Sequence, residues 1–162
     1  MCSTSNLSKT AVIGLGNPLR RDDGIGIRLL DLLRERFKGA DISFLDYGIA
    51  SLGLVNTLRE FERVVLIDAI DAGLEPGLLK IFRFSEAKVA LRDKTLSSHE
   101  LSLGDLVGFC EALDISADVM IAGIQVKDVS YGEGMTQELE SAQPRLAQEI
   151  GDFLASWRLS PR

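Results

Sequence analysis

The stretch "TAVIGLGNPLRRDDGIG", Thr10–Gly26, decides the fold of this chain. It opens with a short aliphatic run, Thr10–Gly16, that ends in glycine, which predicts a buried β-strand. The residues after it predict a helix, because their apolar side chains recur at the spacing of one helical face. These side chains are Ile25, Leu29, Leu32, Leu33 and Phe37. A strand that leads through a glycine-rich turn into a helix is the basic unit of an α/β fold.

The same alternation continues along the chain. Further strands are predicted at 41–46, 63–69, 78–84 and 118–126, and further helices at 51–61, 102–113 and 136–157. Strands separated by helices predict a mostly parallel sheet with helices on both faces. We therefore expect an α/β protein that forms a single domain over 1–162, with a core at 10–157 and a poorly ordered tail at about 1–9.

Three details of this pattern are also predictions. The segment 78–84 alternates apolar and basic residues, which is typical of a half-exposed strand near a sheet edge. Ser51 is expected to cap the second helix. Pro144, inside the last predicted helix, predicts a kink or a break there.

Composition limits the classes of partner. The 162 residues suit one domain, and the net charge of −6 argues against nucleic acid or a membrane surface, which need clustered Lys and Arg. The pair Arg20–Arg21 is expected to be solvated surface. The two cysteines, Cys2 and Cys110, provide no disulfide framework, and the N-terminus lacks the apolar segment of a signal peptide. We expect a cytoplasmic monomer.

Candidate site residues lie where the predicted strands end. Ligands of parallel α/β sheets bind outside the carboxyl ends of the strands. Asp22 and Asp23 follow the first strand, Asp46 ends the second and Asp68 ends the third. His99, the only histidine, lies in the later loop "TLSSHELS".

Each carboxylate also has a structural explanation. Asp22 or Asp23 alone is equally well explained as the cap of the following helix. Asp46 is better explained by binding backbone amides in its own turn. Asp68 is harder to explain in this way, because a carboxylate at the end of an apolar strand needs amides, a cation or a metal to compensate its burial.

Carboxylates and an imidazole together describe a divalent metal site of the kind that zinc or nickel accepts. Other sites fit less well. Leu19 stands where a dinucleotide-binding loop needs its third glycine, no Gly-Lys-Ser/Thr occurs, and Ser97 and Ser98 lie outside any G-x-S-x-G elbow. Cys110 lies in an apolar helical pattern that indicates packing. The residues by themselves favour a metal-dependent hydrolase.

Five motifs in order resemble the hydrogenase maturation endopeptidases, over about residues 11–157. They are "GLGNPLRRDDGIG", "FLDYGIASLGLVNTL", "RVVLIDAIDAGLEPG", "SSHELSLGDLV" and "IAGIQV". The resemblance implies a three-layer α/β/α sandwich with a five-stranded mixed sheet. Two motifs depart from the family pattern: "DYGIASLG" lacks a common Gly-Thr, and "IQVKD" lacks a frequent proline. "GLGNP" also opens bacterial peptidyl-tRNA hydrolases, but the Thr-Arg-His-Asn segment of that family is replaced here by Arg-Asp-Asp-Gly.

The resemblance further implies an activity and a site. Such proteins remove a C-terminal extension from the large-subunit precursor of a [NiFe] hydrogenase after nickel has been inserted. Carried over by motif position, the metal-contacting residues are Asp23, Asp68 and His99, with Asp23 and Asp68 also catalytic and Asp22 left as a helix cap or a support. Two alternatives remain: a metal-binding accessory protein that does not cleave, and a metal-dependent hydrolase of small amides or esters.

Overall fold

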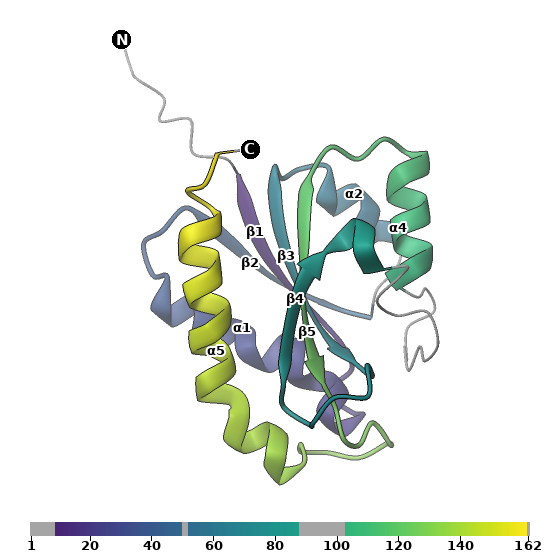
Figure 1. Ribbon diagram of the computed structural model, residues 1–162, viewed down its shortest axis with the longest axis vertical. Coiled ribbons are helices and arrows are strands. Elements are labelled where there is room, and N and C mark those ends of the chain that lie inside the picture. Colours follow the sequence, from purple (N-terminus) through teal and green to yellow (C-terminus); the bar gives the residue numbers. More distant parts are fainter. Residues whose placement is uncertain (1–8, 50–51, 88–102, 162) are drawn as a thin grey trace.

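Figure 1 shows the computed structural model, which describes residues 9–49, 52–87 and 103–161. Within these residues the chain forms a five-stranded sheet in the order β2-β1-β3-β5-β4. The strands are β1 (Thr10–Leu15), β2 (Ile42–Gly48), β3 (Arg63–Ile70), β4 (Leu79–Arg83) and β5 (Asp118–Gln125). All neighbouring strands pair in parallel except β4, which runs antiparallel to β5. The predicted mixed, mostly parallel sheet is confirmed.

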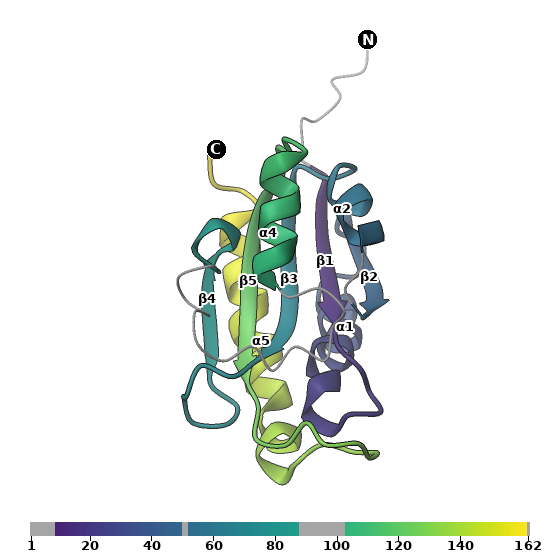
Figure 2. The same ribbon diagram turned by 90° about the vertical axis from the view of Figure 1, so that its right-hand side faces the viewer.

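Helices cover both faces of this sheet, so that the molecule has three layers (Figure 2). The helices are α1 (Ile25–Arg36), α2 (Leu52–Leu58), α4 (Leu103–Ala112) and α5 (Gln137–Trp157). On β3, Val65 and Ile67 pack with α1 and α5, whereas Val64 and Leu66 pack with α2 and α4. Because both faces of β3 are covered, four consecutive aliphatic residues are all buried.

The edge of the sheet at β4 has the predicted character. Lys80 and Arg83 are exposed, Leu79 and Ile81 are half-buried, and Phe82 is buried. An edge strand pairs on one side only, and its charged residues help to prevent pairing with another chain. The half-exposed strand predicted for this segment is therefore confirmed.

The buried face of α1 differs in part from the prediction. Leu32 was expected to face the core but is 44% exposed, while Leu30 is buried in its place. The reason is Gly26, where an added Cβ would lie 2.4 Å from the carbonyl oxygens of both Leu15 and Ile67. Since Gly26 lies directly against the backbone of the sheet, the contact face is centred near it. Leu32 is then rotated about a third of a turn away.

Alanine at Gly26 should therefore destabilise the protein, although alanine favours helices in general. We expect a loss of about 1–3 kcal/mol in the free energy of unfolding, because backbone atoms must move apart to admit the methyl group. The matched control is Gly108→Ala in α4, where a Cβ meets no atom within 4 Å. That variant should be stabilised by about 0.5–1 kcal/mol. Urea unfolding of both variants measures the difference, and a Gly26→Ala variant as stable as the wild type would contradict the close packing.

The remaining expectations concern particular segments. Helix α5 continues through Pro144 from Gln137 to Trp157, so a break at this proline is wrong. Cys110 is buried in the apolar core, as predicted. Ser51 and residues 1–8 lie outside the described residues, so their predictions stay untested. Among the described residues, no helix has the length and apolar character to cross a membrane.

Candidate active site

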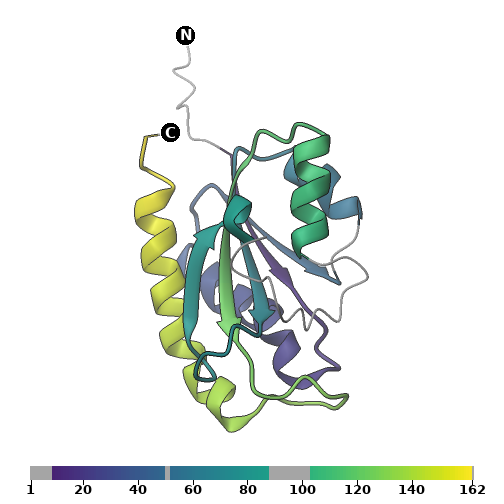
Figure 3. The same cartoon turned by 45° about the vertical axis from the view of Figure 1, so that its right-hand side comes forward.

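The carboxyl ends of β1, β3 and β5 meet at one end of the sheet (Figure 3). Each strand continues there into a loop that carries polar side chains. The loop after β1 contains the single turn of 3-10 helix η1 (Arg21–Gly24), which leads directly into α1. Parallel pairing thus places the ends of three distant segments at one edge, where ligands of such sheets bind.

Asp23 is held inside the turn between β1 and α1. Asp23 is only 1% exposed, and its Oδ2 accepts a hydrogen bond of 2.9 Å from the amide of Asn17. Gly16 makes this turn possible, since its φ is +132° and an added Cβ would lie 1.8 Å from the Asp23 carbonyl oxygen. The first glycines of the motif therefore serve to fold the chain back over Asp23.

Asp68 reaches the same end of the sheet from β3. It is 2% exposed, and its Oδ1 accepts a hydrogen bond of 2.9 Å from the amide of Ala69. The contact of Gly26 with the carbonyl of Ile67 fixes the start of α1 beside the residue that precedes Asp68. Two buried carboxylates from separate segments therefore occupy one end of the molecule, as the sequence predicted. A site of this kind suits a cation, because burial of carboxylates is costly without one or without strong hydrogen bonds.

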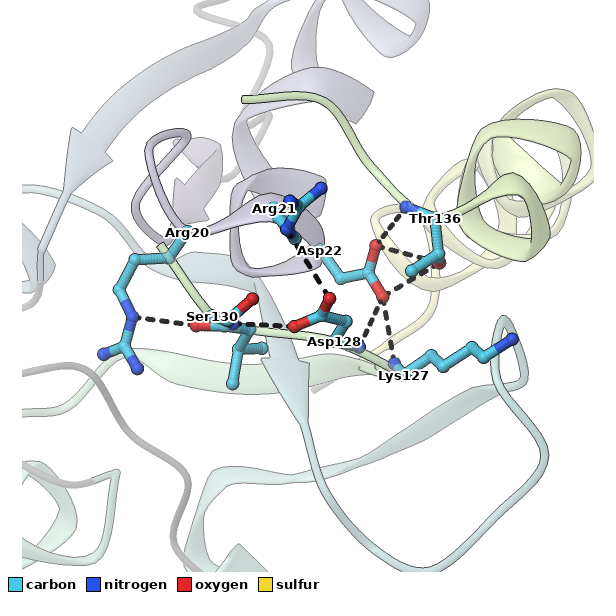
Figure 4. Close-up of polar contacts among 8 residues, drawn as sticks. Arg20, Arg21, Asp22, Lys127, Asp128, Ser130 and Thr136 are labelled. Carbon is cyan, nitrogen blue, oxygen red and sulfur yellow. Dashed lines mark hydrogen bonds and ion pairs between the residues drawn. The ribbon is translucent and has the colours of Figure 1, made fainter. Parts of the chain in front are cut away.

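Asp22 has a structural role, but not as the helix cap that was one of its two predicted roles. It does not cap α1, whose N-cap Gly24 receives no side-chain hydrogen bond. Instead, its fully buried carboxylate accepts hydrogen bonds of 3.0 Å from the amides of Lys127 and Asp128, and of 2.8 Å from the amide of Thr136 (Figure 4). The Thr136 hydroxyl donates to the same carboxylate. Asp22 therefore joins η1 to the segment between β5 and α5.

Arg20 and Arg21 are half-exposed at the surface, and both also bind that same segment. Arg20 donates from Nε to the carbonyl of Val129 at 3.0 Å (Figure 4). Its guanidinium lies 5.2 Å from the ring centre of Tyr131. Arg21 pairs with Asp128 at 3.5 Å. The pKa of Asp128 is lowered, first by hydrogen bonds from Ser130 and then by the charge of Arg21. The two arginines thus hold the segment after β5 in place.

Two further polar residues organise loops at this end. Asp46 accepts a hydrogen bond of 3.1 Å from the amide of Gly48, which is the turn role that its sequence context favoured. Gln125, which sequence reasoning missed, accepts hydrogen bonds of 2.8 Å and 3.1 Å from the amides of Ala72 and Leu74. The sequence signal that could have identified Gln125 is its position, because it is a polar residue directly after the apolar run of β5.

The third predicted metal contact, His99, lies outside the described residues. Within 9–49, 52–87 and 103–161, no three His, Cys, Asp or Glu residues are grouped closely enough to hold a metal ion. The structure therefore brings Asp23 and Asp68 to one end of the sheet, and the complete set of three stays a prediction.

A cleft of about 230 Å³ between α4 and β4 is not part of this site. It is lined by Arg83 at the end of β4 and by Asp118 at the start of β5, which places it at the opposite end of the sheet. Cys110 also lines it, and burial, followed by the charge of Glu111, raises the pKa of its thiol. A raised pKa keeps the thiol protonated and a poor nucleophile, as expected for a packing cysteine.

Comparison with known proteins gives consistent results. The family described as "Hydrogenase maturation protease" matches residues 27–152 of the chain. The hydrogenase expression/formation protein HupD of Bradyrhizobium diazoefficiens is 38% identical over 117 residues, which cover 68% of this chain and 61% of that protein. This chain thus matches less than two thirds of the length of HupD. HoxM of Azotobacter vinelandii, described in the same words, is 30% identical over 89% of this chain and 71% of that protein.

The fold is also found among solved structures. The [NiFe] hydrogenase maturation protease HybD from Thermococcus kodakarensis superposes with a TM-score of 0.72 at 28% identity. The match covers 91% of this chain and 99% of that protein.

Proposed function

Since this chain belongs to the hydrogenase maturation protease family, we propose that it removes the C-terminal extension of a [NiFe] hydrogenase large-subunit precursor once nickel has been inserted. The observation that carries the proposal is the pair of buried carboxylates, Asp23 and Asp68, at the carboxyl end of one parallel sheet. They come from the two segments that the family motifs mark, and both are held in position by backbone amides.

In this proposal nickel belongs to the substrate and arrives with the precursor. Asp23, Asp68 and His99 contact the bound nickel and so place the scissile peptide bond at this end of the sheet. Carboxylate oxygens and an imidazole are suitable ligands for nickel, which gives the site its chemical logic. A carboxylate of the same pair accepts the proton of the water that attacks the peptide carbonyl, and the proton then passes to the leaving amine.

Purified protein mixed with nickel-loaded precursor and, separately, with nickel-free precursor tests the proposal. Mass spectrometry should show loss of the C-terminal extension only from the nickel-loaded form, because the carboxylates recognise the metal as well as the chain. Equal cleavage of both forms would contradict nickel recognition. Binding of the precursor with no change in its mass would identify a non-cleaving accessory protein, and cleavage of small amides or esters but not of the precursor would identify a general hydrolase.

A further inference from the structure

Several large apolar side chains are exposed in the loops at the end of the sheet that carries Asp23 and Asp68. Nine large hydrophobic residues of the described chain are exposed, and five of them lie in loops at the carboxyl end of the sheet. We name these five the apolar rim: Leu19, Ile49, Leu74, Leu78 and Tyr131. They lie in four separate loops, with Leu74 and Leu78 sharing the loop between β3 and β4. Exposed apolar side chains that gather in this way mark surfaces for protein partners.

Two rim residues are the most exposed and lie on paired segments. Tyr131 is 79% exposed and Leu19 is 61% exposed. Their segments form a parallel bridge between Arg20 and Gly132, in which the Gly132 amide donates to the Leu19 carbonyl at 2.9 Å. We call segments 17–21 and 128–132 the loop pair. In Figure 3 it lies at the carboxyl end of the sheet, below the ends of β1 and β5.

The loop pair is rigidly built although its tips are exposed. Arg21 has a φ of +46°, a conformation that a residue with a side chain adopts only where its surroundings impose it. Its guanidinium lies over Gly132, where an added Cβ would be 2.9 Å away. The hydrogen bonds of Asp22 and Arg20 hold the second segment as well. A surface that is ordered before binding avoids the entropic cost of ordering it in the complex.

The loop pair is continuous with the proposed active site. Asn17 begins its first segment, and the amide of Asn17 donates to the carboxylate of Asp23. Tyr and Arg, present here as the stacked Tyr131 and Arg20, are the residue types that contribute most to binding in protein interfaces. A protein substrate whose cleavage site reaches Asp23 therefore comes close to this pair.

We propose that the loop pair docks the folded precursor through Leu19 and Tyr131, which contact an apolar patch of that protein. This proposal rests on the proposed function for the identity of the partner. Docking energy from Leu19 and Tyr131 is expected to act on binding and not on the chemical step, because both side chains are exposed whereas the two carboxylates are buried. Loss of either side chain should therefore raise the precursor concentration needed for cleavage and leave the maximal rate unchanged.

Single-turnover cleavage of nickel-loaded precursor at increasing protein concentration tests this docking. For Leu19→Ser and Tyr131→Ser we expect the half-saturating concentration to rise about tenfold each, with the maximal rate within about twofold of wild type. Tyr131→Phe keeps the ring and should behave like the wild type. The matched control is Leu159→Ser, because Leu159 is 70% exposed but follows α5 at the opposite end of the sheet. Circular dichroism should show unchanged melting for all four variants, since these side chains lie outside the core.

Unchanged half-saturation in both serine variants, or an equal rise in Leu159→Ser, overturns the docking proposal even if the wild type cleaves the precursor. If the wild type binds the precursor without cutting it, the proposed function fails. In that case titration calorimetry of the same variants tests the docking proposal, which predicts that the dissociation constant of the precursor rises about tenfold in each serine variant. If the wild type neither binds nor cuts the precursor, both proposals are wrong.

Discussion

Replacing Asp68 with asparagine should slow precursor processing by about 100-fold or more. Asparagine keeps a side-chain oxygen that can accept the hydrogen bond from the Ala69 amide, but it removes the negative charge. The variant therefore separates the proposed contact with nickel from the local backbone geometry. Asp23→Asn tests the other carboxylate in the same way, because the Asn17 amide can still donate to the amide oxygen. The readout is the single-turnover rate with nickel-loaded precursor.

The control for this experiment is Asp118→Asn at the opposite end of the sheet. Asp118 is the first residue of β5 and pairs with Arg83 at 3.2 Å, an interaction whose loss costs at most about 1 kcal/mol. Its processing rate should stay within about twofold of the wild type. His99→Ala should lose activity like the aspartate variants if His99 is the third nickel contact. An Asp23→Asn or Asp68→Asn variant that processes the precursor at the wild-type rate would overturn the site assignment.

Asp22→Ala should cause a large loss of stability. Three backbone amides and the Thr136 hydroxyl donate to the buried carboxylate, and alanine leaves all of them without that acceptor. Each unsatisfied buried donor costs about 1–3 kcal/mol, partly recovered where water enters. We expect the free energy of unfolding to fall by about 3–5 kcal/mol, measured by urea unfolding with the slope unchanged.

Two other variants serve as comparisons, and both should lose less stability than Asp22→Ala. Asp22→Asn retains one acceptor oxygen and should lose less than Asp22→Ala. Asp31→Ala removes an exposed carboxylate from α1, whose ion pair with Arg34 is on the surface, and should change stability by no more than about 0.5 kcal/mol. A loss below 1 kcal/mol in Asp22→Ala would show that Asp22 does not hold the segment between β5 and α5 in place.

Much of the fold was accessible from sequence because its signals are local. Four aliphatic residues in β3 indicated a strand buried on both faces, and the alternation in β4 indicated an edge. The face of α1 was only partly predictable. Leu32 fits the helical pattern as well as Leu30 does, and what excludes it from the core is the close approach of Gly26 to the sheet. Contact between two backbones depends on tertiary packing, so the spacing of apolar residues in the sequence does not reveal it.

The candidate site shows the same division. The placement of Asp23 and Asp68 was predictable because one follows a recognisable strand, the other lies near the end of one, and the carboxyl ends of parallel strands share one edge. Their selection among the candidate carboxylates came from the family resemblance. The roles of Asp22, Arg20 and Arg21 were not identifiable in this way. Their partners lie in the segment after β5, and most of those partners are backbone groups. Every residue carries such groups, so they produce no sequence pattern.

The sequence by itself therefore determined the order of strands and helices, the parallel sheet and the two carboxylates at its carboxyl end. These follow from periodicity and from glycine positions, which act over a few residues. Only the tertiary structure decided which groups each aspartate of the pair contacts. Asp22 reaches the amide of Thr136, 114 residues further along the chain, while Asp23 stays within the glycine turn. Asp22 and Asp23 are adjacent and chemically identical, so their different contacts result from the tertiary fold and not from the residue type.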